Sequence, residues 1–368
     1  MDASQIARRF PLIARPRPAC PPLSERLREI NELAASAERD GDLLKAAVAQ
    51  NKAALIASDC GLTALARTLC WAHAQAYLGA PEPLTGRTAR LALEPLVNLA
   101  RLRIRSGDGD KAYEILSTLF RAVGQRLPQA TVDGRPLSLT SLPVEHDERR
   151  AIVQWLWTVL LADGTRALTG GGRWREALDA IEQHKGIGGR LLDGRQVAVL
   201  ARLDEGEWEA ALELLSTAQF GEPWEEDVAS CLTVASLEEG SQPTEAAVTR
   251  MARRYLDGHP EPGLVVFRTQ WGLTVLDLSA EERTAQTVIR RLVDETLGSS
   301  DGYAARELLE HPSADDILTA ETRRALLHMA EASGLRPSQA LPGVAAEIQR
   351  SASTAQNVTL RLQQSDTE

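Results

Sequence analysis

The sequence is short of aromatic residues, of lysine and of positive charge, and each shortage argues against a class of protein. Phe, Trp and Tyr make up 4% of the 368 residues, which argues against a large aromatic-lined ligand pocket. Lysine supplies only four of the 41 basic residues, a codon bias typical of a GC-rich bacterial genome. The formal net charge is −10, so the chain as a whole does not attract nucleic acid.

Cysteines and long apolar runs are also scarce. Cys20, Cys60, Cys70 and Cys231 form no C-x-x-C pair and have no histidines at zinc-finger spacing, so we expect buried thiols in a reducing compartment. No run approaches the 18 apolar residues of a membrane span. The arginine-bearing first 22 residues lack the continuous apolar core of a secretory signal. These features predict a cytoplasmic protein.

The remaining pattern is almost entirely helical, because apolar residues recur at helical spacing between short Gly/Asp breakers. We expect an extended, Pro- and Arg-rich arm at 1–23 and helical repeats at 24–126 and 147–350. A loop at 127–146 is the expected boundary between the two helical blocks, since Pro136 and Pro143 oppose strands there. The polar segment 351–368 is expected to be a flexible tail.

Two heptapeptides, GRWREAL at 172–178 and GEWEAAL at 206–212, share the pattern G-x-W-x-x-A-L, and their tryptophans are 34 residues apart. Trp174, Ala177 and Leu178 lie at i, i+3 and i+4, which is one face of a helix, and Trp208 begins an equivalent face. We therefore predict that both tryptophans fill a seam between stacked helical hairpins. On this basis Trp208→Ala should lower the free energy of unfolding by about 3–5 kcal/mol.

This 34-residue spacing, with an aromatic residue and a small central alanine, resembles the tetratricopeptide repeat (TPR) family. The resemblance is specific for about 147–220 and weaker elsewhere, and the tryptophan opens the second helix of each hairpin instead of the first. It implies an all-α fold, a right-handed α-solenoid of antiparallel helix hairpins. It also implies a concave groove, lined by the first helices of the hairpins, that binds extended peptides.

Polar residues on the first helices are the candidates for such binding. Arginine suits a peptide carboxylate because its planar fork donates two parallel hydrogen bonds. On 96–105 and 191–204 the apolar residues leave such side chains facing outward, Gln196 among them, and Trp224 follows a proline in a loop. The predicted partner-binding residues are Asn98, Arg101, Arg105, Gln154, Arg195, Arg202 and Trp224.

Catalytic patterns are absent from the sequence. It has no P-loop, no H-E-x-x-H and no G-x-S-x-G, and we predict neither a cofactor nor a metal. The best acid/base or metal candidates are His146, Asp147 and Glu148. An acidic cluster just before a helix is, however, ordinary complementarity to the helix dipole.

The sequence therefore predicts a non-catalytic adaptor or scaffold that binds a protein or peptide, as an accessory or regulatory subunit of a bacterial enzyme or biosynthetic complex. The alternative is an effector- or peptide-responsive regulator; an enzyme on an all-α scaffold is a weaker third reading. We expect no membrane binding and no nucleic-acid binding by the chain itself. Homo- or hetero-oligomerisation is left open.

Overall fold

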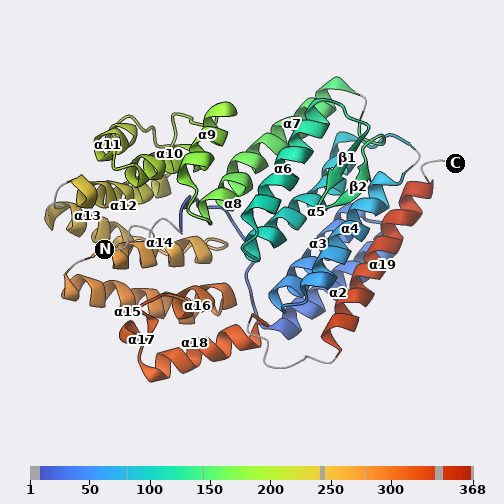
Figure 1. Ribbon diagram of the computed structural model, residues 1–368. Coiled ribbons are helices and arrows are strands. Elements are labelled where there is room, and N and C mark those ends of the chain that lie inside the picture. Colours follow the sequence, from blue (N-terminus) through green and yellow to red (C-terminus); the bar gives the residue numbers. More distant parts are fainter. Residues whose placement is uncertain are drawn as a thin grey trace. The chain divides into compact units, whose positions relative to one another are not determined.

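The computed structural model describes residues 9–80, 82–143, 145–240, 245–279, 281–335 and 343–365. These residues are helical apart from one short hairpin and the connections (Figure 1), so the all-α class is confirmed. The elements are α2 (Leu23–Asp40), α3 (Leu43–Asp59), α4 (Thr63–Leu78), α5 (Gly86–Arg105), α6 (Gly109–Gly124), β1 (Gln129–Val132), β2 (Arg135–Ser138), α7 (His146–Val159), the π-helix η1 (Leu160–Gly164), α8 (Thr165–Thr169), α9 (Trp174–Gln183), α10 (Asp193–Asp204), α11 (Trp208–Ser216), α12 (Pro223–Gly240), α13 (Glu245–Asp257), α14 (Val265–Asp277), α15 (Glu282–Ser299), α16 (Gly302–Leu309), α17 (Ala314–Ile317), α18 (Ala320–Ala332) and α19 (Val344–Ser365). No helix within these ranges is both long and apolar enough to cross a bilayer.

The chain divides into two compact units, each built from two separate stretches of sequence. Unit 1 takes its described residues from Met1–Pro21 and Leu168–Ser333, and unit 2 from Pro22–Ala167 and Gly334–Glu368. The chain passes between the units within α8, which differs from the expected boundary in the 127–146 loop. The sequence pattern could not show this division. Residues 1–21 belong with Leu168–Ser333, and residues 334–368 belong with Pro22–Ala167, so each unit joins stretches that are far apart in sequence.

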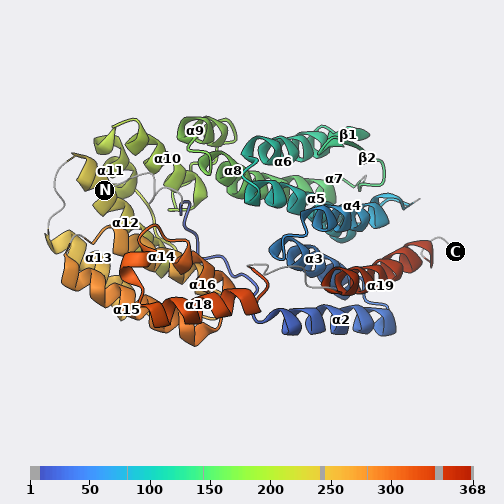
Figure 2. The same ribbon diagram turned by 60° about the horizontal axis from the view of Figure 1, so that its bottom comes forward.

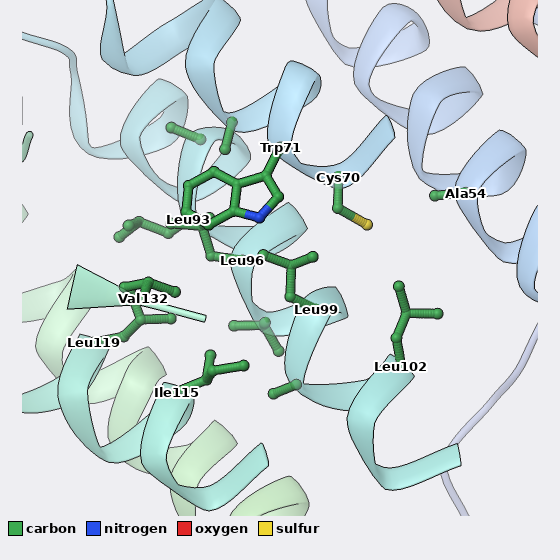
Figure 3. Close-up of a cluster of buried hydrophobic side chains, with 14 of the residues drawn as sticks. Ala54, Cys70, Trp71, Leu93, Leu96, Leu99, Leu102, Ile115, Leu119 and Val132 are labelled. Atoms are coloured by element: carbon green, nitrogen blue, oxygen red, sulfur yellow. The ribbon is translucent and has the colours of Figure 1, made fainter. Parts of the chain in front are cut away.

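In unit 2 each helix from α2 to α7 packs against the next one in the chain. Their facing apolar residues form one core, part of which is shown in Figure 3. Leucines from α5 (Leu93, Leu96, Leu99) meet Trp71 of α4 and Ile115 of α6, and all five are at most 2% exposed. Small residues of α3 and α4 let these helices approach one another closely, since alanine leaves no bulky side chain between them.

The C-terminal segment differs from the expected flexible tail, because α19 packs against α2, α3 and α4 (Figure 2). Its buried residues Ile348, Ala352, Ala355 and Val358 recur every three or four positions and form an apolar stripe. Burial of this narrow stripe orders a helix whose remaining faces are polar. Residues 366–368 lie outside the described part of the chain.

The 127–146 segment, expected to be a loop, holds an antiparallel hairpin in which β1 pairs with β2. Asp133 and Gly134 form its turn and both have positive φ, 49° and 77°, as the type I′ turn of a two-residue hairpin requires. Asp133 is 8% exposed, and its carboxylate accepts hydrogen bonds from Arg67 and Arg103. Pro136 is tolerated because a two-stranded hairpin has free outer edges.

The helices of unit 1 pack in chain order. Each of α9 to α13 contacts the helix that follows it, and further contacts join α10 to α12, α12 to α14, α14 to α16 and α13 to α15. Trp174 is buried at the start of α9, as expected, with 5% of its surface exposed. Trp208, at the start of α11, is only half-buried, so the predicted core position holds for one tryptophan and not fully for the other.

Residues 9–21, the described part of the expected arm, contain no regular helix or strand and belong to unit 1. We call this segment the arm; residues 1–8 lie outside the described ranges. Phe10, Leu12 and Cys20 are at most 2% exposed, whereas residues 15–19 between them are exposed. The arm is therefore anchored at both ends and open to solvent in the middle.

Candidate functional site

The predicted binding residues of α5 are engaged within unit 2. Arg101 donates to the carboxylate of Asp163 at 2.9–3.0 Å, and it also donates to Oδ1 of Asn98 at 3.0 Å. Arg105 donates to the buried carboxylate of Asp59 at 3.1 Å. Each guanidinium is therefore neutralised within its own unit. Gln154, on α7, is exposed to solvent.

The predicted residues of unit 1 also have partners inside the fold. Arg195 donates to the backbone carbonyls of Gly188 and Leu214 at 2.9 and 2.7 Å and thereby ties α10 to the end of α11. Trp224 is half-buried at the start of α12, with its ring edge-to-face against Phe267 at 5.9 Å. Arg202 lies on α10 and pairs with carboxylates at the α10–α11 turn.

The side chain with the most informative contacts on α10 is Gln196, which the sequence groups with outward-facing polar residues. It is fully buried, and its amide pairs with the backbone of Leu12 in the arm. The Leu12 N–H donates to Oε1 at 2.7 Å, and Nε2 donates to the Leu12 carbonyl at 3.0 Å. A glutamine amide can satisfy both backbone groups of an extended residue at once, because it carries a donor and an acceptor side by side.

Charged groups hold the arm on either side of Leu12. Arg9 donates to Asp277 at the end of α14 at 2.6 Å, and Arg15 pairs with Asp193 at the start of α10. His311 hydrogen-bonds the other oxygen of Asp277 through Nε2 at 2.9 Å. Burial raises the pKa of Asp277, but the hydrogen bond from His311 and the charge of Arg9 outweigh it, so the pKa lies below its usual value.

The second anchor is at Cys20, where the arm meets α16. The Cys20 N–H donates to Oδ2 of Asp301 at 2.9 Å, and the Cys20 carbonyl accepts from Gly302 N–H at 2.9 Å and from the Ser333 hydroxyl at 3.1 Å. Asp301 also caps α16, since Oδ1 accepts from the Tyr303 N–H at 2.8 Å. Between the anchors, the Arg17 N–H donates to the Gly263 carbonyl just before α14 at 2.9 Å.

These contacts place the arm along α10, α14 and α16 of unit 1, which we call the arm-binding face. The polar contacts reach the backbone and the arginines of the arm, and its side chains Phe10, Leu12 and Cys20 are buried. Sequence patterns could not identify this face, because Gln196, Asp277 and Asp301 are far apart in the chain and none belongs to a motif. The only available signal was the Pro- and Arg-rich composition of the arm itself.

The acid/base candidates show no special geometry. His146, Asp147 and Glu148 lie in the first turn of α7, where the two carboxylates complement the helix dipole. Within the described ranges, no group of three or more His, Cys, Asp or Glu side chains is placed to hold a metal ion. All four cysteines are buried thiols, as expected, and burial raises the pKa of Cys70 and of Cys231 to about 12.

Comparison with known proteins returned no match to a family model, to a curated protein or to a solved structure.

Proposed function

We propose that this protein is a non-catalytic, TPR-like adaptor that holds an extended peptide segment on the arm-binding face of unit 1. In this proposal the arm occupies that face in the resting protein, and a segment of a partner protein takes its place. The observation that carries the proposal is the paired hydrogen bonding of Gln196 with both backbone groups of Leu12. Recognition through the backbone suits peptides in general, because every residue except proline offers the same two groups.

The packing of unit 1 supports the TPR-like part of the proposal. Contacts between consecutive helices, together with those linking α10, α12, α14 and α16, are the contacts that a stack of helical hairpins makes. In such a stack alternate helices line one surface. The residues that hold the arm come from α10, α14 and α16, which are alternate helices, so we interpret the arm-binding face as the inner surface of the stack.

The composition of the arm supports its role as a bound segment. Pro11, Pro16, Pro18 and Pro21 fix φ in four of its 13 residues. A chain restricted in this way loses less conformational entropy when it binds than an ordinary flexible peptide does. A proline-rich segment of a partner would have the same advantage.

Exchange of the arm tests the proposal. A protease site inserted between Pro21 and Pro22, where the chain passes from unit 1 to unit 2, turns the arm into a separate peptide while the folded protein stays intact. We expect a fluorescein-labelled peptide of residues 9–21 to exchange into the cleaved protein, as measured by fluorescence polarisation. Gln196→Leu should weaken its binding by about tenfold, because two buried hydrogen bonds are lost.

Asp204→Asn is the matched control, since Asp204 is an exposed residue of the same helix; it should leave peptide affinity unchanged. Circular dichroism of each cleaved protein reports whether unit 1 stays folded during exchange. If the arm leaves only when unit 1 unfolds, it is a fixed structural element and the proposed peptide face is wrong. Equal binding of a scrambled peptide would also refute specific recognition.

A further inference from the structure

Helix α11 in unit 1 is apolar in sequence and partly covered by the rest of the fold. Six of its nine residues, WEAALELLS, are Trp, Ala or Leu, yet only Ala211 and Leu215 are buried. Trp208, Leu212 and Leu214 are each half-buried. Leu212 and Leu214 are two positions apart and face opposite sides of the helix, so Leu214 is the half-buried leucine of α11 that lines a cavity beside this helix.

A cavity of about 500 Å³ opens beside this helix, between α9, α10 and α11. Leu178 of α9, Ala198 of α10 and Leu214 of α11 supply its apolar lining. Leu178 and Ala198 are almost fully buried, at 1% and 2% exposure, so they form the floor. The cavity is large enough for a few aliphatic side chains.

Carboxylates surround this apolar floor. Glu182, Glu207 and Glu213 line the cavity together with a single cation, Arg202. Arg202 is already neutralised, since it pairs with Glu207 at 2.8 Å and with the neighbouring Glu205. Among the described residues, neither Glu182 nor Glu213 has an ion-pair partner, and both are exposed. The rim therefore has two carboxylates that no ion pair within the described part of unit 1 neutralises.

We propose that α11 and this cavity form a second docking surface, which binds a partner segment carrying leucine-like side chains flanked by lysine or arginine. The apolar side chains would fill the cavity, and the cations would meet Glu182 and Glu213. A second copy of this chain would not bind through the same face, because the two acidic rims would then repel each other.

This surface is independent of the arm-binding face. Side chains two residues apart on a helix point about 200° away from each other, so Gln196 and Ala198 lie on opposite sides of α10. Gln196 holds the arm, whereas Ala198 lines the cavity. The inference therefore goes beyond the proposed function, and either proposal can fail without the other.

A direct test uses the full chain and a fluorescein-labelled peptide of about 15 residues, long enough for a helix, with leucines at i, i+3, i+4 and i+7 and lysines elsewhere. Binding is measured by fluorescence polarisation. We expect Glu182→Lys with Glu213→Lys to weaken binding by at least about tenfold, because two attractions become repulsions. Ala210→Trp, in the cavity lining, should weaken binding by blocking the cavity while net charge stays constant.

The matched control carries Asp204→Lys with Glu209→Lys, two exposed residues outside the lining. It changes the net charge by the same amount, so it separates a local site from general attraction to an acidic protein. We expect it to change affinity by less than about twofold. Two results would overturn the proposal: equal weakening by the two double variants, or equal binding of a peptide in which glutamate replaces every lysine.

Discussion

Acid should destabilise unit 2 through His73, a histidine buried in α4. Its side chain is 1% exposed, Nε2 has no hydrogen-bond partner among the described residues, and the ring centre lies 5.8 Å from that of Tyr77. Burial lowers the pKa of His73 from 6.5 to about 3. The folded protein therefore keeps this imidazole neutral at pH values at which an unfolded chain protonates it.

The size of the effect follows from proton linkage. A lowered folded-state pKa means that the unfolded state binds the extra proton between pH 6.5 and about 3, so stability is complete above pH 6.5 and falls as the pH decreases through this window. At pH 5 an unfolded histidine is almost fully protonated, and a folded one with a pKa near 3 is not. The loss of unfolding free energy from pH 7.5 to pH 5 is then about 2 kcal/mol.

Urea unfolding followed by circular dichroism at pH 7.5 and pH 5 measures this loss, and His73→Leu isolates the contribution of this histidine. Leucine is apolar and similar in volume, so it removes the titration without opening a large cavity. We expect the variant to lose about 2 kcal/mol less than the wild type between the two pH values. Equal losses in the two proteins would show that His73 is hydrated or paired, and the reasoning from burial would be refuted.

Three further outcomes can be measured. Trp174→Ala should lower the free energy of unfolding by about 3–5 kcal/mol and Trp208→Ala by only about 1–2 kcal/mol in chemical denaturation, because the second ring is half-buried; the reverse order would contradict this. Asp133→Asn should cost about 1–2 kcal/mol in the same assay, since it keeps the turn but removes the charge that two arginines share. Cys70 and Cys231 should react with a thiol reagent at pH 8 only after urea unfolding, because burial raises the pKa of each thiol to about 12; fast labelling of the native protein would disprove it.

Most helices could be predicted from the sequence, because apolar residues recur at helical spacing within each one and glycine or aspartate residues mark its ends. The turns at Gly107, Gly172 and Gly206 have positive φ, between 74° and 78°, and the glycines that separate helical segments in the sequence mark these turns correctly. The hairpin could also have been predicted. Asp133-Gly134 is the preferred pair of a type I′ turn, and this dipeptide outweighs the two prolines, which lie outside the turn.

Longer-range structure was not predictable, because it depends on residues that only the fold brings together. The stripe of Ile348, Ala352, Ala355 and Val358 has helical spacing, yet its polar surroundings gave no reason to expect a neighbour for it. The arm is similar: its composition indicates an extended chain, but not that Gln196 and Asp301 hold it. Arg101 and Arg105 are similar, because their carboxylate partners, Asp163 and Asp59, come from other elements of unit 2 that the sequence does not place beside α5.

The two heptapeptides share a pattern, but their side chains are buried to different extents. Trp174 and Leu178 are almost fully buried, whereas their counterparts Trp208 and Leu212 are half-buried, although both alanines of the pattern are fully buried. The shared pattern therefore sets how the alanine side of each helix packs against its neighbour, and the burial of the tryptophan and the leucine depends on what else surrounds the helix. The acidic cavity lies on the opposite side of α11, where Ala210, Glu213 and Leu214 line it. The departure from equivalence at Trp208 and Leu212 is therefore separate from the surface where we propose that a basic partner segment docks, and Trp208→Ala changes the one without changing the lining of the other.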